Sequence, residues 1–149
     1  MIIWYAQEQH TSCVAACLRM VFSDFGPAPT EKRIRRLLGA AQFGHSLKDA
    51  WRQLIAVGMQ ATLHEDWDLI DLRDCLRDGW YPIVGVERGF FGHNESPHAL
   101  VLLNVSSQAI QALDPLGTAT AEVISPETFA RAWCSAGQQA LVIQSPFPT

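Results

Sequence analysis

The chain has 149 residues, of which 48% are hydrophobic and 17% charged, a composition typical of a folded globular domain. Its net charge of −4 and its isoelectric point near 5.6 argue against a nucleic-acid partner. No stretch approaches the roughly 20 apolar residues that a membrane span requires. The first five residues are too short for a signal peptide and carry no positive side chain. We therefore expect one domain over residues 1–149, with no nucleic-acid partner and no membrane span.

Hydrophobic periodicity predicts five helices, and local signals mark their ends. The first helix should run from Cys13 to Asp24, with Ser12 or Thr11 accepting a hydrogen bond from its first free N–H groups. The other predicted helices cover residues 31–38, 47–57, 69–77 and 127–134, with Thr30, Ser46, Asp68 and Ser125 before them as capping residues.

Shorter runs rich in apolar and β-branched residues predict strands between and after these helices. They cover residues 59–63, 81–87, 99–105, 109–113, 120–124 and 139–144. Helices dominate the first half of the chain and strands the second, which indicates an α+β fold with an N-terminal helical lobe and a C-terminal antiparallel sheet lobe.

A reactive cysteine is expected at Cys13, where a polar segment turns into an apolar helix. In the first turn of a helix, the unpaired N–H groups and the positive end of the helix dipole favour a thiolate, which is the nucleophilic form. Gln7 precedes it by a short loop, and its amide can donate to an oxyanion. Gln9 is the alternative for this role.

Two later stretches supply a candidate general base and a candidate carboxylate that could orient this base. His98 begins the continuous apolar run 99–103, so a buried strand would hold it rigidly. Asp114 ends a short strand at an Asp-Pro turn and could orient the imidazole of His98. His93, in the loop of residues 88–96, is the rival base, and turn formation alone would also explain Asp114.

These residues together resemble a known family. Gln7, the run from Cys13 to Cys17, His98 before its strand, and Asp114-Pro115 follow the order found in bacteriocin-processing peptidase domains of the papain-like cysteine peptidases. The chain departs from the family pattern where Ser12 and Val14 flank the cysteine. The resemblance implies a papain-like two-lobed fold, a Cys-His-Asp triad of Cys13, His98 and Asp114, and a Gln oxyanion hole at Gln7.

The resemblance also implies cleavage after a Gly-Gly motif. Glycine has no Cβ, so a Gly-Gly segment fits a cleft that is only as wide as a backbone. We expect Trp80, Phe90 and Phe91, near the strand and loop that lead to His98, to form the walls of such a cleft.

The remaining cysteines lack the spacing of a disulfide framework. Cys17, Cys75 and Cys134 lie in apolar helical patterns and are expected in the core, in a chain that folds reduced. A metal site of His10, Cys13 and Cys17 lacks a second close pair of ligands, so no metal and no cofactor is expected. The expected location is the cytoplasm of the cell of origin, or that of a target cell after delivery.

Two settings remain open for such a peptidase. It could mature a secreted peptide beside an exporter, or act as an antibacterial effector that requires a cognate immunity protein. The alternatives are a peptide-binding module that does not cleave, and an acyl transferase or deamidase on the same fold.

Overall fold

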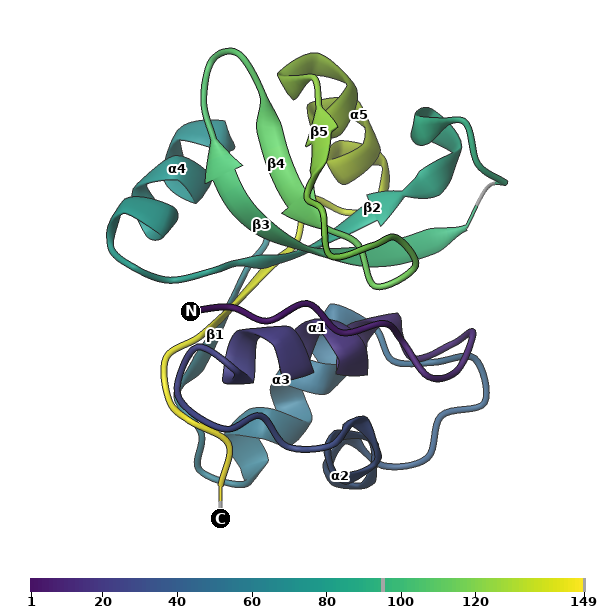
Figure 1. The fold of residues 1–149 in the computed structure, drawn as a ribbon, viewed down its shortest axis with the longest axis vertical. Helices are drawn as coiled ribbons and strands as arrows, with labels where there is room; N and C mark the ends of the chain where they lie inside the picture. The colour runs from purple at the N-terminus through teal and green to yellow at the C-terminus, as the bar shows by residue number, and fades with distance from the viewer. Residues whose placement is uncertain (95, 149) are drawn as a thin grey trace.

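Three helices build the first lobe of the computed structural model, which describes residues 1–94 and 96–148. The helices are α1 (Cys13–Phe22), α2 (Glu31–Leu38) and α3 (Leu47–Ala56). They lie below the sheet in Figure 1, and the N-terminal segment crosses between α1 and the sheet. Thr30 and Ser46 cap α2 and α3 through their side chains, as their positions in the sequence predict.

The second lobe is an antiparallel sheet of six strands in the order β1-β6-β2-β3-β4-β5. Two helices, α4 and α5, pack on its outer face (Figure 1). The strands are β1 (Ala61–His64), β2 (Ile83–Glu87), β3 (Pro97–Val105), β4 (Ile110–Leu113), β5 (Glu122–Ile124) and β6 (Ala140–Ile143). The helices are α4 (Leu69–Arg77) and α5 (Pro126–Ser135), and a short 3₁₀ helix, η1 (Arg88–Phe91), follows β2. The predicted loop 88–96 includes position 95, which lies outside the described residues.

Alternate side chains of the central strands fill two separate cores, because successive residues of a strand point to opposite faces. Ile83 and Val101 face α1 in the first core, whereas Val84, Leu100 and Leu102 face α5 and α4 in the second. The α+β architecture with its two lobes is therefore confirmed. The packing of α1 on β3 brings the start of the first helix to the sheet.

The start of α1 differs from the prediction. Ser12 occupies the N-cap position, but its side chain makes no capping hydrogen bond to the helix. Its hydroxyl lies 3.1 Å from Oε1 of Glu31 and 2.9 Å from the carbonyl of Gln9. The expected side-chain cap at Ser12 is wrong because a fully buried carboxylate on α2 draws the hydroxyl away from the helix.

Two further details depart from the expectations. Helix α1 ends at Phe22 rather than Asp24, and Ser23 to Phe25 continue as a turn with hydrogen bonds to the third residue back. Cys134 is exposed rather than buried, because the inward stripe of α5 consists of Phe129, Ala132 and Trp133. No helix among the described residues has the length and apolar character needed to cross a membrane.

Buried Glu31 ties α2 to the segment before α1, which yields a stability prediction. Its carboxylate accepts from the backbone N–H of Glu8 at 3.0 Å and pairs with Arg35 at 3.1 Å. Glu31→Gln keeps the shape but removes the charge, so we expect the free energy of unfolding to fall by about 2–3 kcal/mol. Denaturant titration measures this loss.

The matched control is Glu127→Gln, at an exposed acid in the first turn of α5. It should change the free energy of unfolding by less than about 0.5 kcal/mol. Equal effects of the two substitutions would contradict the structural role of Glu31.

Candidate active site

The candidate site forms where the ends of β3 and β4 meet the start of α1. His98 is the second residue of β3, and its side chain is only 4% exposed. Asp114 directly follows β4, which pairs with β3 through Val101 and Leu113. The sheet register therefore places the two polar side chains beside each other at one end of neighbouring strands.

Asp114 holds His98 in one orientation. Its Oδ1 accepts a hydrogen bond from Nε2 of His98 at 2.6 Å and a second from the backbone N–H of Leu116 at 2.8 Å. The indole of Trp4 donates to the carbonyl oxygen of Asp114 at 2.9 Å. With Nε2 committed to Asp114, Nδ1 is the imidazole nitrogen left to face Cys13.

The surroundings of His98 favour its charged form. Burial lowers the pKa of His98, but the hydrogen bonds and negative charges of Asp114 and Cys13 outweigh it and raise the pKa to about 9. Burial acts on Asp114 in the opposite direction and raises its pKa. The hydrogen bonds from His98 and Leu116 and the positive charges of His98 and Arg88 lower the pKa of Asp114 overall. At neutral pH the pair is therefore an imidazolium and a carboxylate.

Cys13 lies opposite this pair, at the first position of α1. It is partly exposed and lines a cleft of about 540 Å³ together with His98. Cys13 is the first residue of the helix, where the backbone N–H has no partner within the helix, and its N–H donates to no acceptor among residues 1–94 and 96–148. A free N–H beside a partly exposed thiol is the arrangement that an oxyanion requires.

Gln7 lies in the segment that leads to Cys13. Its backbone N–H donates to the carbonyl of Pro115 at 3.0 Å, which ties this segment to the Asp114-Pro115 turn. Its side-chain Nε2 donates to the carbonyl of Gln9 at 2.7 Å, and its Oε1 is buried with no partner among the described residues. An amide nitrogen carries two hydrogens, so one N–H of Gln7 has no partner among the described residues, although Gln7 is not among the residues that line the cleft.

The three expected wall residues are not placed together. Phe90 and Phe91 line a second cavity of about 400 Å³, to which His98 and Asp114 also belong. Trp80 lies elsewhere, stacked on Phe25 and beside His64. The structure therefore does not bring Trp80 to the cleft, because the turn after α4 carries it to the opposite end of the strand that leads to the site.

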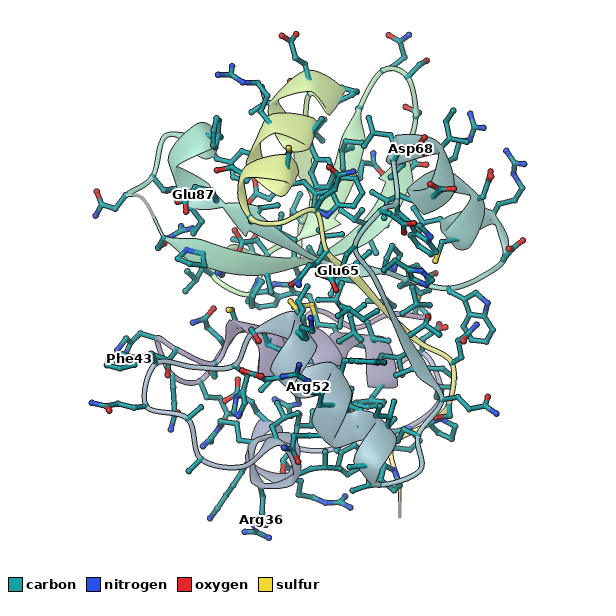
Figure 2. All side chains as sticks on the ribbon, turned by 180° about the vertical axis from the view of Figure 1, so that it is seen from behind. Arg36, Phe43, Arg52, Glu65, Asp68 and Glu87 are labelled. Atoms are coloured by element: carbon teal, nitrogen blue, oxygen red, sulfur yellow. The ribbon has the colours of Figure 1, made fainter. Side chains whose placement is uncertain are left out.

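The cleft has other walls that the sequence analysis missed. A Cβ on Gly85 would lie 3.8 Å from Cδ1 of Leu47, so the two lobes approach closely here. Phe43 also lines the cleft and is 87% exposed. Figure 2 shows Phe43 projecting outward on the same side of the molecule as Glu87, at the end of β2. A lone aromatic residue in a glycine-containing loop was the available signal.

Gly44 fixes the loop that carries Phe43. Its φ of +85° lies in the left-handed region, and a Cβ there would lie 2.5 Å from the carbonyl oxygen of Thr11. Only glycine permits this approach. The loop is thus anchored two residues before Cys13.

The rival residues occupy different positions. His93 is exposed and lines the second cavity, and Asp114 makes its hydrogen bond to His98 instead. His10 is exposed at the rim of the cleft. Gln9 offers its carbonyl to Gln7. The described residues contain no group of three or more His, Cys, Asp or Glu side chains placed to bind a metal ion.

Solved structures share this architecture. A C39-like peptidase from Bacillus anthracis superposes with a TM-score of 0.80 at 13% identity, over 99% of this chain and 98% of its own. The peptidase domain of Streptococcus ComA, a bifunctional ABC transporter of a quorum-sensing pathway, gives a TM-score of 0.76 at 17% identity, over 97% and 100%. A double-glycine-motif protease from an AMS/PCAT transporter, solved with its leader peptide, gives 0.70 at 17%, over 97% and 93%.

The solved structures show a shared fold, and the sequence itself assigns the chain to a family. No curated protein matches the chain. The model of the Peptidase C39 family matches residues 2–145, nearly the whole chain, which confirms the expected resemblance. The protein therefore belongs to the Peptidase C39 family and is a cysteine peptidase.

Proposed function

We propose that this peptidase cleaves peptide bonds on the C-terminal side of a Gly-Gly motif, with Cys13 as nucleophile, His98 as acid and base, and Asp114 as the orienting residue. One observation carries the proposal: the 2.6 Å hydrogen bond from His98 to Asp114 aims the other imidazole nitrogen at Cys13 across an open cleft. An imidazolium beside a thiol favours the thiolate, which is the attacking form.

Acylation begins when the Cys13 thiolate attacks the carbonyl carbon of the second glycine. The new C–S bond gives a tetrahedral oxyanion, which the Cys13 N–H and the free amide N–H of Gln7 can stabilise, at about 3–4 kcal/mol for a well-placed donor. The C–N bond then breaks, and His98 gives its proton to the departing amine. The product is a thioester on Cys13 and a free peptide with a new N-terminus.

Deacylation uses the same groups in reverse. Neutral His98 takes a proton from water, and the resulting hydroxide attacks the thioester carbonyl. The C–S bond breaks, and the thiolate and imidazolium are restored. Asp114 keeps its charge throughout and stabilises the imidazolium at each step.

The narrow part of the cleft supports the Gly-Gly preference. A Cβ built on Gly85 would already lie 3.8 Å from Cδ1 of Leu47 on the other lobe, so a substrate side chain has little room at this point. Exposed Phe43 offers an apolar contact to the part of the substrate before the glycines. The similar protease solved with a leader peptide supports a substrate of the same class.

Leader-peptide maturation is the setting that the comparisons favour. Two of the similar structures are peptidases of transporters, which suggests an exporter as partner. An antibacterial effector with an immunity protein, acting in the cytoplasm of a target cell, would use the same chemistry. The orientation of His98 by Asp114 argues against a domain that binds peptides without cutting them, and transfer to an amine instead of water would need a second substrate in the cleft.

The Gly-Gly preference can be measured with matched peptides. Replacing either glycine before the cut by alanine adds one methyl group where the lobes meet, so we expect kcat/KM to fall about a hundredfold. Mass spectrometry of the products gives the cleavage position. A peptide with a bulky residue in these two positions that is cut as fast would contradict the narrow cleft, and Cys13→Ala should cut none of them.

The reactivity of Cys13 can be compared with that of Cys134, the exposed thiol on α5. At pH 7 iodoacetamide should alkylate Cys13 at least tenfold faster, because the imidazole of His98 beside it activates the sulfur as a nucleophile. Burial raises the pKa of Cys75 to about 11 and also raises the pKa of Cys17, so both should react slowly. Peptide mapping follows each site.

His98→Ala tests the cause of this reactivity. It should slow alkylation of Cys13 to about the rate of Cys134, and His93→Ala should leave the rate of Cys13 unchanged. The reverse pattern would assign the base to His93.

A further inference from the structure

A second cavity lies behind the catalytic pair, on the side away from α1. Its volume is about 400 Å³, and both His98 and Asp114 form part of its wall. Arg88 and His98 line this cavity and also the cleft that holds Cys13. The two spaces therefore meet at His98.

The cavity has a mixed lining, in which polar side chains such as Glu122, Ser125 and Thr128 stand beside a group of five apolar ones. Phe90 and Phe91 of η1, Leu100 of β3, and Val123 and Ile124 of β5 line it. Val123 is 69% exposed and Phe90 is 36% exposed, although most large apolar residues of the sheet lobe are buried. Apolar side chains around a concave site beside a catalytic residue indicate a binding site for an apolar group.

The position of His98 indicates which part of a substrate reaches this cavity. The acyl half of the substrate stays bonded to Cys13, on the side of α1. The leaving amine must come within hydrogen-bonding distance of His98 to receive its proton. The residues that follow the cut are attached to that amine, so they extend past His98 toward the second cavity.

Arg88 lies where the cleft and the second cavity meet, and one of its hydrogen-bond donors has no partner among the described residues. Its Nε is buried and has no hydrogen-bond partner among the described residues. No ion pair of Arg88 is recorded among these residues, although its positive charge acts on Asp114. A peptide that extends from the cleft into the cavity would offer backbone carbonyl groups to this guanidinium.

We propose that the second cavity is the subsite for the substrate residues just after the cut, and that it prefers an apolar side chain there while Arg88 holds the backbone. This inference rests on the proposed function, since it assigns the leaving-group side of the same reaction. The peptidase would then select its substrate on both sides of the cut. The narrow cleft selects glycine before the cut, and the cavity selects an apolar residue within the first three positions after it.

Two substrates with the same leader and Gly-Gly distinguish selection before the cut from selection after it. One is the Gly-Gly methyl ester, whose leaving group is methanol and cannot reach the cavity. The other continues for six residues after the cut, either all serine or with one leucine at position one, two or three. In the unmodified protein, leucine at one of these positions should raise kcat/KM about tenfold over serine.

Val123→Ser removes an apolar wall without touching Cys13, His98 or Asp114. The ratio of kcat/KM for the leucine peptide to that for the ester should fall about tenfold in this variant. Val57→Ser, at a valine of 50% exposure after α3, is the matched control and should leave the ratio unchanged.

The outcomes distinguish the two claims. If leucine gives no gain at any of the three positions, or if Val123→Ser lowers both substrates equally, the subsite is wrong although Gly-Gly cleavage stands. If the unmodified protein hydrolyses neither substrate, the proposed function fails and the subsite fails with it.

Discussion

The hydrogen bond between His98 and Asp114 is the interaction on which the site depends. It joins the ends of β3 and β4, and it decides which imidazole nitrogen faces the cleft. The turn after Asp114 is held from the other side by the N-terminal segment, through the indole of Trp4 and the backbone N–H of Gln7. The same segment continues into Cys13, so one stretch of chain contacts the Asp114 turn and carries both Gln7 and Cys13.

The two lobes divide the chemistry between them. In the proposed mechanism the sheet lobe supplies the acid-base pair, and the helical lobe supplies the thiol and its free backbone N–H. That N–H is unpaired in the described part of the chain because Cys13 is the first residue of α1, where the backbone N–H has no acceptor within the helix. In the proposed complex the substrate lies between the lobes, at the point where Gly85 and Leu47 approach each other closely.

The sequence predicted the features that local chemistry determines. A cysteine at the start of an apolar helix, a histidine before a buried strand and an Asp-Pro turn each have a local signature, and the structure brings these three residues to one place. The sequence did not reveal the features that depend on packing between distant segments of the chain. Trp80 follows α4 and stacks on Phe25, Cys134 falls outside the inward stripe of α5, and the second cavity exists only because η1 and β5 converge beside His98.

The protonation of His98 is the most direct test of this account. A group whose pKa is raised stays charged until the pH passes that raised value, so His98 should be an imidazolium at pH 7.5 and titrate near pH 9. Nitrogen-15 NMR of the imidazole measures this titration, and Asp114→Asn should lower the midpoint because it removes the carboxylate that stabilises the cation. A wild-type midpoint at the ordinary histidine value of 6.5, unchanged in Asp114→Asn, would contradict the central claim.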